Sequence, residues 1–503
     1  MPDVKEDANN VRYAGIPVVI LDAVGTKHEM KRLHLRVYPL SFGSIRTCRL
    51  LQAEPLARKS RFFRRSSGGG FCRFCLSTPV LRPSICALRG GRTPGAFFFE
   101  TAFLWGGLKK KMALKHNFDE VIDRTHTNSS KWLKYPADVL PMWVADSDFK
   151  CPQPVVEAVS KLAQFGVYGY PYVNEGGFEK ATVAWCKRRL GFDVRPDQCD
   201  YVPSLGTALA VAVKAFTQPG DQVLMQSPIY PPFTAVTVKN SRTPVYNTLK
   251  FVDGNYQIDF DDFEKLASDP KTKLFLLCNP HNPTGRCFTR EELEKMVEIC
   301  AKNNVVIFSD EVHSDFVYAP HKHISLPTLN QTARDICLVG LNPSKTFNIA
   351  GLRTAGVVSP SSNPKLQQEY QHALASCKLG RNIFGDLAYQ ICFGGECDYY
   401  AEQVRDYVKG NIDYAVEALN KIPGIKAYTP DATYLLWIDC TGLGFETQEE
   451  LDKFAVEQCK VGLNPGESFG KEGKCFLRMN LACPRSYVVE GCKRIAEAVA
   501  KRA

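Results

Sequence analysis

Two short segments place a side chain capable of chemistry directly after an apolar run. Residues 279–285 (Asn-Pro-His-Asn-Pro-Thr-Gly) follow the apolar run 275–278, and their prolines and glycine fix a backbone that presents an Asn amide. Residues 309–313 (Ser-Asp-Glu-Val-His) follow the apolar run 305–308. A carboxylate buried there without a partner would cost free energy, so we expect Asp310 to face a cation or a hydrogen-bond donor.

Two further segments offer an amine and a place for an anion. Residues 342–348 (Asn-Pro-Ser-Lys-Thr-Phe-Asn) follow the apolar run 336–341, where desolvation can lower the pKa of Lys345 enough for a Schiff-base amine. Residues 204–207 (Ser-Leu-Gly-Thr) precede a predicted helix at 208–216, whose first N–H groups attract a phosphate. Taken singly, the four segments also fit a rigid turn, a helix cap or a solvated lysine.

Together the four segments match the needs of one ligand. A phosphorylated pyridine aldehyde requires a helix N-terminus for its phosphate and an anion for its ring nitrogen. It also requires a donor for its ring oxygen and a lysine for its aldehyde. The four segments supply each of these groups.

The elements that would position these segments alternate between strands and helices from residue 112 onward. Thr289-x-x-Glu292 forms a capping box before an amphipathic stretch that runs to residue 302. The alternation predicts an α/β fold with a mostly parallel sheet flanked by helices, whose chemistry lies at the carboxyl ends of the strands. A smaller α+β domain is predicted near the C-terminus, with helices at 399–421 and 487–501 and strands at 434–439 and 475–481.

Length and composition are those of a soluble globular protein with two or three domains. The 503 residues are 45% hydrophobic and 23% charged. The best candidate for a membrane span, residues 96–108, is shorter than the ~18 residues required and carries Glu100, so no membrane association is predicted. The nineteen cysteines are scattered with little regular spacing, which favours reduced thiols.

The net charge of +10 is concentrated in the first 111 residues. That stretch holds 20 Lys and Arg against 7 Asp and Glu, so the rest of the chain holds 43 against 46 and is nearly neutral. A nearly neutral body gives no support for nucleic-acid binding, which needs a basic face on a folded surface. Residues 1–111 contain Arg, Ser and Gly clusters and are predicted to be a disordered or non-homologous extension.

Three origins of this extension remain open: an erroneous or alternative start of the chain, an organelle-targeting sequence, or a folded accessory region. Its Arg-rich, acid-poor part is typical of targeting peptides, but the first 29 residues are acidic in places. We predict a cytoplasmic protein, with a mitochondrion or plastid as the alternative. Cys72-x-x-Cys75 with Cys86 lacks the fourth ligand of a structural zinc site, so no metal is predicted.

Longer stretches of the chain carry a family resemblance. From about residue 117 to 500 the sequence resembles the fold-type I enzymes that use pyridoxal 5'-phosphate (PLP), in the class I/II aminotransferase superfamily. Within it, the sequence is similar to the MalY/PatB-type branch of cystathionine beta-lyases and cysteine desulfhydrases. The stretches that carry this likeness are residues 142–149, 168–170, 309–313, 343–351 and 476–486.

The resemblance implies roles around the cofactor ring. Lys345 would bond covalently to the PLP aldehyde, Asp310 would pair with the ring nitrogen, and Asn282 would hydrogen-bond the ring oxygen. Tyr230 would stack on the ring face. His313 stands where many aminotransferases have a tyrosine that contacts the ring oxygen, and the lyase branch shares this histidine.

The resemblance also implies a phosphate site that is shared between two subunits. Gly206, Thr207, Ser344 and Arg353 would hold the phosphate, joined by Tyr170 from the other subunit of a homodimer. The implied fold has a seven-stranded-type sheet. Its large PLP-binding domain would span residues 159–395, and its small domain would combine residues 112–158 and 396–503.

The substrate implied by the resemblance is a small amino acid. Arg478 would clamp its α-carboxylate as a bidentate fork, a geometry that a lysine could not reproduce. Arg485 is the alternative for this clamp, although we interpret it as structural. Ala145 would contribute to substrate binding.

Carbon–sulfur β-lysis of cystathionine, cysteine or a cysteine S-conjugate, giving pyruvate, ammonia and a thiol, is the reaction that we favour. Transfer of the amino group from an L-amino acid to a 2-oxo acid would use the same residues and remains the alternative. A second alternative is a non-catalytic regulatory protein of the same fold. Retention of Lys345, Asp310, Asn282 and Arg478 together speaks against that possibility.

Overall fold

The computed structural model describes residues 115–173 and 176–502, together with four strands nearer the N-terminus. The chain divides into two compact units, Met1–Met112 and Ala113–Ala503. The strands of the first unit form one sheet in the order β3-β2-β1-β4, with bounds β1 Val18–Ala23, β2 Leu33–Tyr38, β3 Arg46–Arg49 and β4 Cys86–Arg89. The rest of the predicted extension at 1–111, including Cys72 and Cys75, lies outside the described residues.

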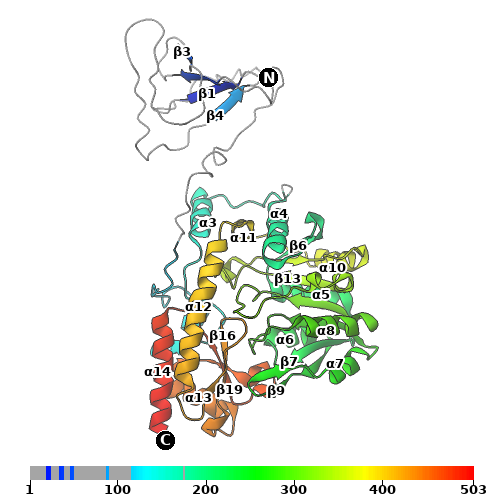
Figure 1. Ribbon diagram of the computed structural model, residues 1–503, viewed down its shortest axis with the longest axis vertical. Coiled ribbons are helices and arrows are strands. Elements are labelled where there is room, and N and C mark those ends of the chain that lie inside the picture. The colour runs from blue at the N-terminus through cyan, green and yellow to red at the C-terminus, as the bar shows by residue number, and fades with distance from the viewer. Residues whose placement is uncertain are drawn as a thin grey trace, which may run out of the picture. The chain divides into compact units, whose positions relative to one another are not determined.

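The second unit is built around a seven-stranded sheet in the order β6-β14-β13-β12-β11-β7-β8 (Figure 1). Its strands are β6 Cys199–Val202, β7 Gln222–Ser227, β8 Thr243–Thr248, β11 Thr272–Cys278, β12 Val306–Asp310, β13 Cys337–Leu341 and β14 Ala355–Val358. β14 runs antiparallel to both of its neighbours, and every other neighbouring pair is parallel. The predicted α/β fold with a mostly parallel sheet is therefore confirmed.

Side chains of the central strands alternate between two hydrophobic clusters. In β11, Leu274 and Leu276 join one cluster, whereas Phe275 and Leu277 join the other. Because helices cover both faces of the sheet, its strands can be continuous apolar runs. The first cluster includes residues of α5 Leu205–Phe216, α6 Pro231–Lys239 and α10 Pro364–Ser376. The second includes residues of α4 Gly177–Trp185, α7 Phe260–Ala267, α8 Arg290–Lys302, α9 Gln331–Ile336 and α11 Ile383–Gly394.

Two helix starts show how the local sequence sets an element's bounds. The capping box predicted for α8 is present, because Thr289 Oγ1 accepts from the Glu292 N–H while the Glu292 carboxylate accepts from the Thr289 N–H. α5 begins at Leu205, three residues before the predicted start at 208. The reason is that the Ser204 hydroxyl accepts a hydrogen bond from the Thr207 N–H and caps the helix there.

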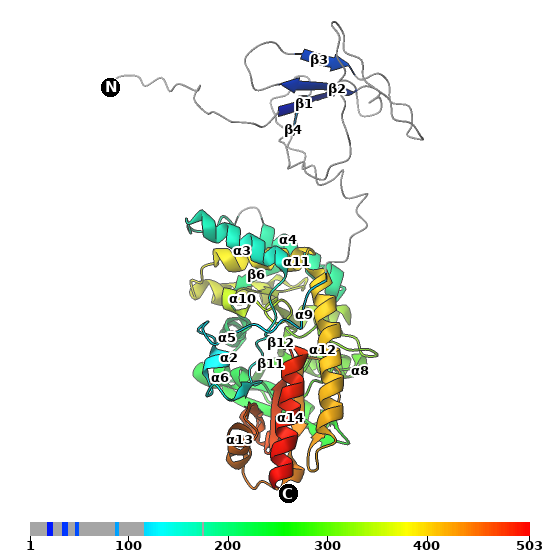
Figure 2. The same cartoon turned by 90° about the vertical axis from the view of Figure 1, so that its left-hand side faces the viewer.

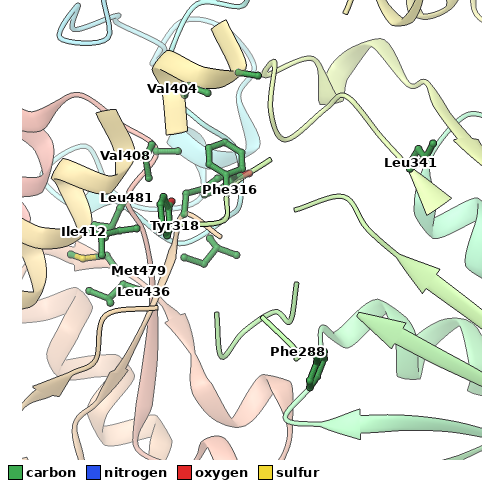
Figure 3. Close-up of a cluster of buried hydrophobic side chains, with 14 of the residues drawn as sticks. Phe288, Phe316, Tyr318, Leu341, Val404, Val408, Ile412, Leu436, Met479 and Leu481 are labelled. Carbon is green, nitrogen blue, oxygen red and sulfur yellow. The ribbon is translucent and has the colours of Figure 1, made fainter. Parts of the chain in front are cut away.

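The C-terminal part contains a second sheet beside two long helices, α12 Asp398–Leu419 and α14 Arg485–Arg502, which run side by side (Figure 2). The sheet has the order β15-β16-β19-β18, with bounds β15 Lys426–Ala427, β16 Leu435–Asp439, β18 Asn464–Pro465 and β19 Phe476–Asn480. Val404, Val408 and Ile412 repeat every four residues on α12 and lie in one buried cluster with Leu436 and Met479 (Figure 3). The boundaries proposed between a large and a small domain remain a prediction.

Shorter elements complete the second unit: α2 Ser130–Leu133, α3 Gln153–Phe165, α13 Gln448–Glu457, the paired strands β5 Leu140–Pro141 and β17 Val461–Gly462, and the hairpin of β9 Lys250–Val252 and β10 Asn255–Gln257. None of the helices in the described ranges has the length and apolar character that a bilayer crossing requires. In the same part of the chain, no cluster of three or more His, Cys, Asp or Glu side chains is arranged to hold a metal ion.

We expect Ile412→Ala to lower the free energy of unfolding by about 2–5 kcal/mol, because the side chain is fully buried and its loss leaves a cavity. Glu417→Ala on the same helix is the control, since Glu417 forms only an exposed ion pair with Lys421 and should change stability by less than about 0.5 kcal/mol. Urea unfolding of both variants measures the difference. Equal losses would contradict the packing assigned to α12.

Candidate active site

Polar loops meet at one edge of the seven-stranded sheet. β6, β13, β12 and β11 run in the same direction, so the loops predicted from the sequence emerge together at their carboxyl ends. The last residues of these strands are Val202, Leu341, Asp310 and Cys278. Because β14 runs the opposite way, Arg353, two residues before its start, reaches the same edge.

Asp310 is a buried carboxylate that forms no ion pair with any of the described residues. Its Oδ1 accepts a hydrogen bond of 3.1 Å from the backbone N–H of Val312. Burial raises the pKa of Asp310 to about 7, and the positive charge of Lys345 opposes this shift. A cationic N–H group placed against Asp310 would offset the cost of burying its charge.

Lys345 lies in the loop that follows β13, and its Nζ donates a hydrogen bond of 2.7 Å to the carbonyl oxygen of Ala145. Desolvation and the positive charge of Arg478 lower the pKa of Lys345 to about 8, against opposing contributions from Asp146 and Asp310. More of this amine is therefore neutral near physiological pH than for a solvated lysine. A neutral amine can act as a nucleophile or as a general base.

Arg478 on β19 is buried and is fixed by three contacts. Its Nη1 donates to Asn282 Oδ1 at 2.9 Å, and its Nη2 donates to the carbonyl oxygen of Trp143 at 3.1 Å. Its guanidinium lies over the ring of Phe469, 4.7 Å from the centroid. Burial lowers the pKa of Arg478 to about 10, so the group stays charged at neutral pH. Its Nε finds no hydrogen-bond partner within the described ranges and can still receive a carboxylate.

Residues 143–149, here named the carbonyl segment, present main-chain oxygens to the site. These oxygens accept hydrogen bonds from the side chains of Arg478, Asn480, Lys345, Asn348, Tyr434, Arg124 and Lys131. Lys345 and Asn348 belong to the loop after β13, whereas Arg478 and Asn480 belong to β19. The carbonyl segment therefore connects the two parts of the chain that carry the amine and the guanidinium.

Buried charges hold the carbonyl segment from its other side. Lys131 is 1% exposed, and its Nζ donates to Asp148 Oδ2 at 2.6 Å and to the Asp146 carbonyl oxygen at 2.9 Å. Arg124 bridges Asp148 Oδ1 and Asp146 Oδ2, each at 2.9 Å. Because breaking a buried pair leaves an uncompensated charge, at a cost of about 3–5 kcal/mol, this network fixes the segment in one position.

The residues predicted to hold a phosphate lie where β6, β14 and β13 meet the site edge. A Cβ added to Gly206 would meet only the Ser204 hydroxyl, at 3.8 Å, so the start of α5 is open to a ligand. Thr207 Oγ1 lies 3.0 Å from the same hydroxyl. Ser344 is buried in the loop after β13, and Arg353 is exposed with a left-handed backbone at φ 53°. This arrangement suits an anion bound between a helix N-terminus and a guanidinium.

Tyr230 and His313 are electrostatically linked to the same charged groups. Burial raises the pKa of Tyr230. The positive charge of Arg478 opposes this increase, and the negative charge of Asp310 adds to it. Burial, together with the positive charges of Lys345 and Arg478, lowers the pKa of His313 to about 3, so this imidazole is neutral. Its Nδ1 lacks a hydrogen-bond partner in the described part of the chain.

Three predicted residues have other positions. The side chain of Tyr170 is fully exposed, so no other predicted site residue covers it within this chain. Ala145 contributes its carbonyl oxygen to Lys345. Arg485 Nε donates to Asn411 Oδ1 on α12 at 2.7 Å, a contact that fits the structural interpretation of this arginine.

Sequence reasoning missed three residues of the site: Tyr434, Asn480 and Asp146. Asn480 follows Arg478 by two positions on β19, so the strand period that brings both side chains to one face was a usable signal. Tyr434 donates from its hydroxyl to the Ala145 carbonyl at 3.2 Å, across 289 positions of the chain. No pattern in the sequence predicts a contact between residues that are so far apart in the chain.

The residues present suit PLP. Asp310 offers an unpaired carboxylate for a protonated ring nitrogen, Lys345 offers an amine of lowered pKa for an aldehyde, and the start of α5 offers donors for a phosphate. The unpaired nitrogens of His313 and Arg478 gain partners when a polar ring and a carboxylate enter the site.

The chain belongs to the aminotransferase class I and II family, whose sequence pattern matches residues 138–495. Cystathionine beta-lyase PatB of Bacillus subtilis (strain 168) is 37% identical over 394 residues, which cover 76% of this chain and 100% of PatB. Cystathionine beta-lyase of Corynebacterium glutamicum is 33% identical over 380 residues, covering 75% and 99%. The solved structure of cystalysin from Treponema denticola, which contains a pyridoxal 5'-phosphate cofactor, matches with a TM-score of 0.74 and 29% identity over 78% of this chain and 100% of cystalysin. The predicted family is confirmed.

We expect the contribution of Asp310 to the stability of the cofactor-free protein to fall as the pH rises from about 4 to about 7. Asp310 binds its proton more firmly when folded, with a pKa near 7 against an ordinary 3.8, so raising the pH through this window favours the unfolded chain. Asp310→Asn should remove this part of the slope. Urea unfolding at a series of pH values gives the free energy of unfolding of both proteins. If it changes with pH equally in both, Asp310 is not a buried acid without a partner.

Proposed function

We propose that this chain is a PLP-dependent carbon–sulfur β-lyase that acts on cystathionine, cysteine or a cysteine S-conjugate. The observation that carries the proposal is the meeting of an amine of lowered pKa, Lys345, with an unpaired buried acid, Asp310, and a buried arginine, Arg478. The likeness to PatB supports a lyase over other members of the family. The LL-diaminopimelate aminotransferase of Aquifex aeolicus is a weaker match, at 29% identity over 365 residues.

We propose a separate catalytic role for each of three side chains, Asp310, Arg478 and Lys345. When bound, PLP supplies an electron-withdrawing ring that stabilises negative charge at the substrate's α-carbon. Asp310 keeps the ring nitrogen protonated, because its buried carboxylate gains a cationic partner by doing so. Arg478 orients the substrate through its α-carboxylate, and the neutral amine of Lys345 takes the proton from the α-carbon.

Elimination then breaks the bond between the β-carbon and sulfur, and the sulfur leaves as a thiolate. The ammonium form of Lys345 can return its proton to that thiolate, so the amine ends the step neutral. Hydrolysis of the three-carbon product consumes one water and gives pyruvate and ammonia. His313 stands where many aminotransferases have a tyrosine, and this difference supports the lyase branch over plain transamination.

The active unit proposed is a homodimer in which Tyr170 reaches the phosphate of the neighbouring site. The supporting observation is a run of exposed apolar and aromatic side chains around this residue: Phe165, Val167, Tyr168, Tyr170, Tyr172 and Val173. Such a surface is costly to leave in water and is typical of an interface. Retention of Lys345, Asp310, Asn282 and Arg478 together speaks against the non-catalytic alternative.

A cytoplasmic location remains a prediction.

The purified protein should release pyruvate from cystathionine without any added 2-oxo acid. Lys345→Ala should abolish this activity, because it removes the amine that takes the proton from the α-carbon. Arg478→Lys should raise the KM about tenfold or more, since a lysine cannot form the bidentate pair. A coupled pyruvate assay measures all three proteins. Product that appears only when a 2-oxo acid is supplied would identify a transaminase instead.

Mixing two defective subunits should restore activity if Tyr170 serves its neighbour. Tyr170→Ala is expected to weaken PLP retention, and Lys345→Ala lacks the amine, so each variant alone is impaired. Freely mixed subunits would contain one intact site in each heterodimer, giving about a quarter of the unmodified activity. Pyruvate release from the mixture, compared with each variant alone, is the measurement. Activity equal to the sum of the separate variants would contradict the shared site.

A further inference from the structure

Tyr434 and Lys345 donate to the same acceptor. The amine of Lys345 donates to the Ala145 carbonyl oxygen at 2.7 Å, and the Tyr434 hydroxyl donates to the same oxygen at 3.2 Å. A carbonyl oxygen has two lone pairs, so both donors can bind it at once. The roles proposed above use Lys345 and assign nothing to Tyr434.

The backbone directly before Tyr434 is held in an uncommon conformation. Thr433 is buried and has a left-handed φ of 71°, which a β-branched residue rarely adopts. Its N–H donates to the Phe316 carbonyl at 2.7 Å, its carbonyl accepts from the Tyr318 hydroxyl at 2.7 Å, and its Oγ1 accepts from the Leu435 N–H at 3.1 Å. Strain of this kind persists only where the surroundings enforce it, and it is common beside functional groups.

Burial and two neighbouring rings fix the phenol of Tyr434. The residue is 1% exposed, and its ring lies edge-on to the rings of Phe316 and His313, with centroids 4.8 and 5.8 Å away. Burial raises the pKa of Tyr434 above its usual range, and the charge of Asp146 adds to this increase, whereas Arg478 opposes it. The hydroxyl therefore stays protonated at physiological pH and remains a hydrogen-bond donor.

We propose that Tyr434 is a positioning residue for Lys345, because its hydroxyl holds the Ala145 carbonyl and occupies one of the two lone pairs. The shared oxygen then keeps the amine in place without binding its ammonium form tightly. When Lys345 leaves this oxygen to bond with an aldehyde, Tyr434 still donates to it, so the partly buried carbonyl keeps a partner. This inference rests on the proposed function, in which Lys345 is both the covalent anchor and the base.

Sharing the oxygen affects the balance between the two protonation states of Lys345. An ammonium gains more from a carbonyl oxygen than a neutral amine does, and a second donor on that oxygen weakens its bond to the ammonium. Loss of the Tyr434 hydroxyl should therefore raise the pKa of Lys345. The other titratable groups that face this amine are unchanged by that substitution: Asp146, Arg478, Asp310 and His313.

The experiment measures the rate at which the cofactor-free protein captures PLP covalently over a range of pH. In this step the neutral amine of Lys345 forms a C=N bond with the aldehyde carbon, and the aldehyde oxygen leaves as water with the two amine protons. The rate, followed by the visible absorbance of the bound cofactor, therefore reports the fraction of neutral amine. Ionisation of PLP itself is common to all variants, so a shift between variants belongs to the protein.

Tyr434→Phe keeps the ring and loses only the hydroxyl. Its capture curve should move to higher pH by about half a unit to one unit, which is the equivalent of one hydrogen bond. Replacement of Tyr434 with 3-fluorotyrosine keeps every native group, makes the hydroxyl a stronger donor, and should move the curve to lower pH. Tyr389→Phe is the matched control, because Tyr389 is also fully buried but its hydroxyl bonds to Thr182 on α4, so this curve should not move.

Coincident curves for Tyr434→Phe and the unmodified protein would overturn the inference, as would shifts in the same direction for the phenylalanine and fluorinated proteins. A purely structural Tyr434 would lower the free energy of unfolding in urea without moving either curve, which would overturn it as well. Failure of the proposed function has a different result: the unmodified protein would capture PLP and yet release no pyruvate from cystathionine. The two failures are therefore distinguishable.

Discussion

The structure depends on the main-chain oxygens of the carbonyl segment. Buried carbonyl groups must find donors, and here the donors are the side chains that the chemistry requires. Lys345 and Arg478 bind oxygens only two residues apart, at Ala145 and Trp143. A displacement of this segment would therefore move the amine and the guanidinium together. The hydrogen bonds that pair these buried carbonyl groups also fix the positions of the amine and the guanidinium.

Two buried aspartates near this segment serve different purposes, and their partners separate them. Asp148 is fully paired, with Lys131 on one oxygen and Arg124 on the other, and so belongs to the framework. Asp310 is equally buried but has only one backbone donor, and burial raises its pKa to about 7. A purely structural role does not require a buried acid that has one donor and a raised pKa. An unpaired buried acid at the end of a strand marks the place where a ligand completes the structure.

The sequence predicted the site best where chemistry follows directly from local pattern. Asp310 and Lys345 each follow an apolar run, so their position at a strand's carboxyl end could be predicted without any relative. Arg478 lies inside an apolar strand, and only the family resemblance indicated its role.

The bond from Lys345 to Ala145 was beyond prediction, because it joins residues 200 positions apart and depends on how the two sheets pack. The early start of α5 was missed for a local reason, since Ser204 was taken as part of the loop rather than as the residue that caps the helix.

The reversed direction of β14 has a consequence for the loop that precedes it. The chain leaves the sheet at Leu341 and returns to the same edge at Ala355, and both ends are pinned by strand pairing. Lys345 and Arg353 both lie in the segment that connects β13 to β14. An inserted or deleted residue between them could not be absorbed by sliding the neighbouring strands. The number of residues between the two therefore sets the span between an amine and a guanidinium, which we propose to hold opposite ends of one bound molecule.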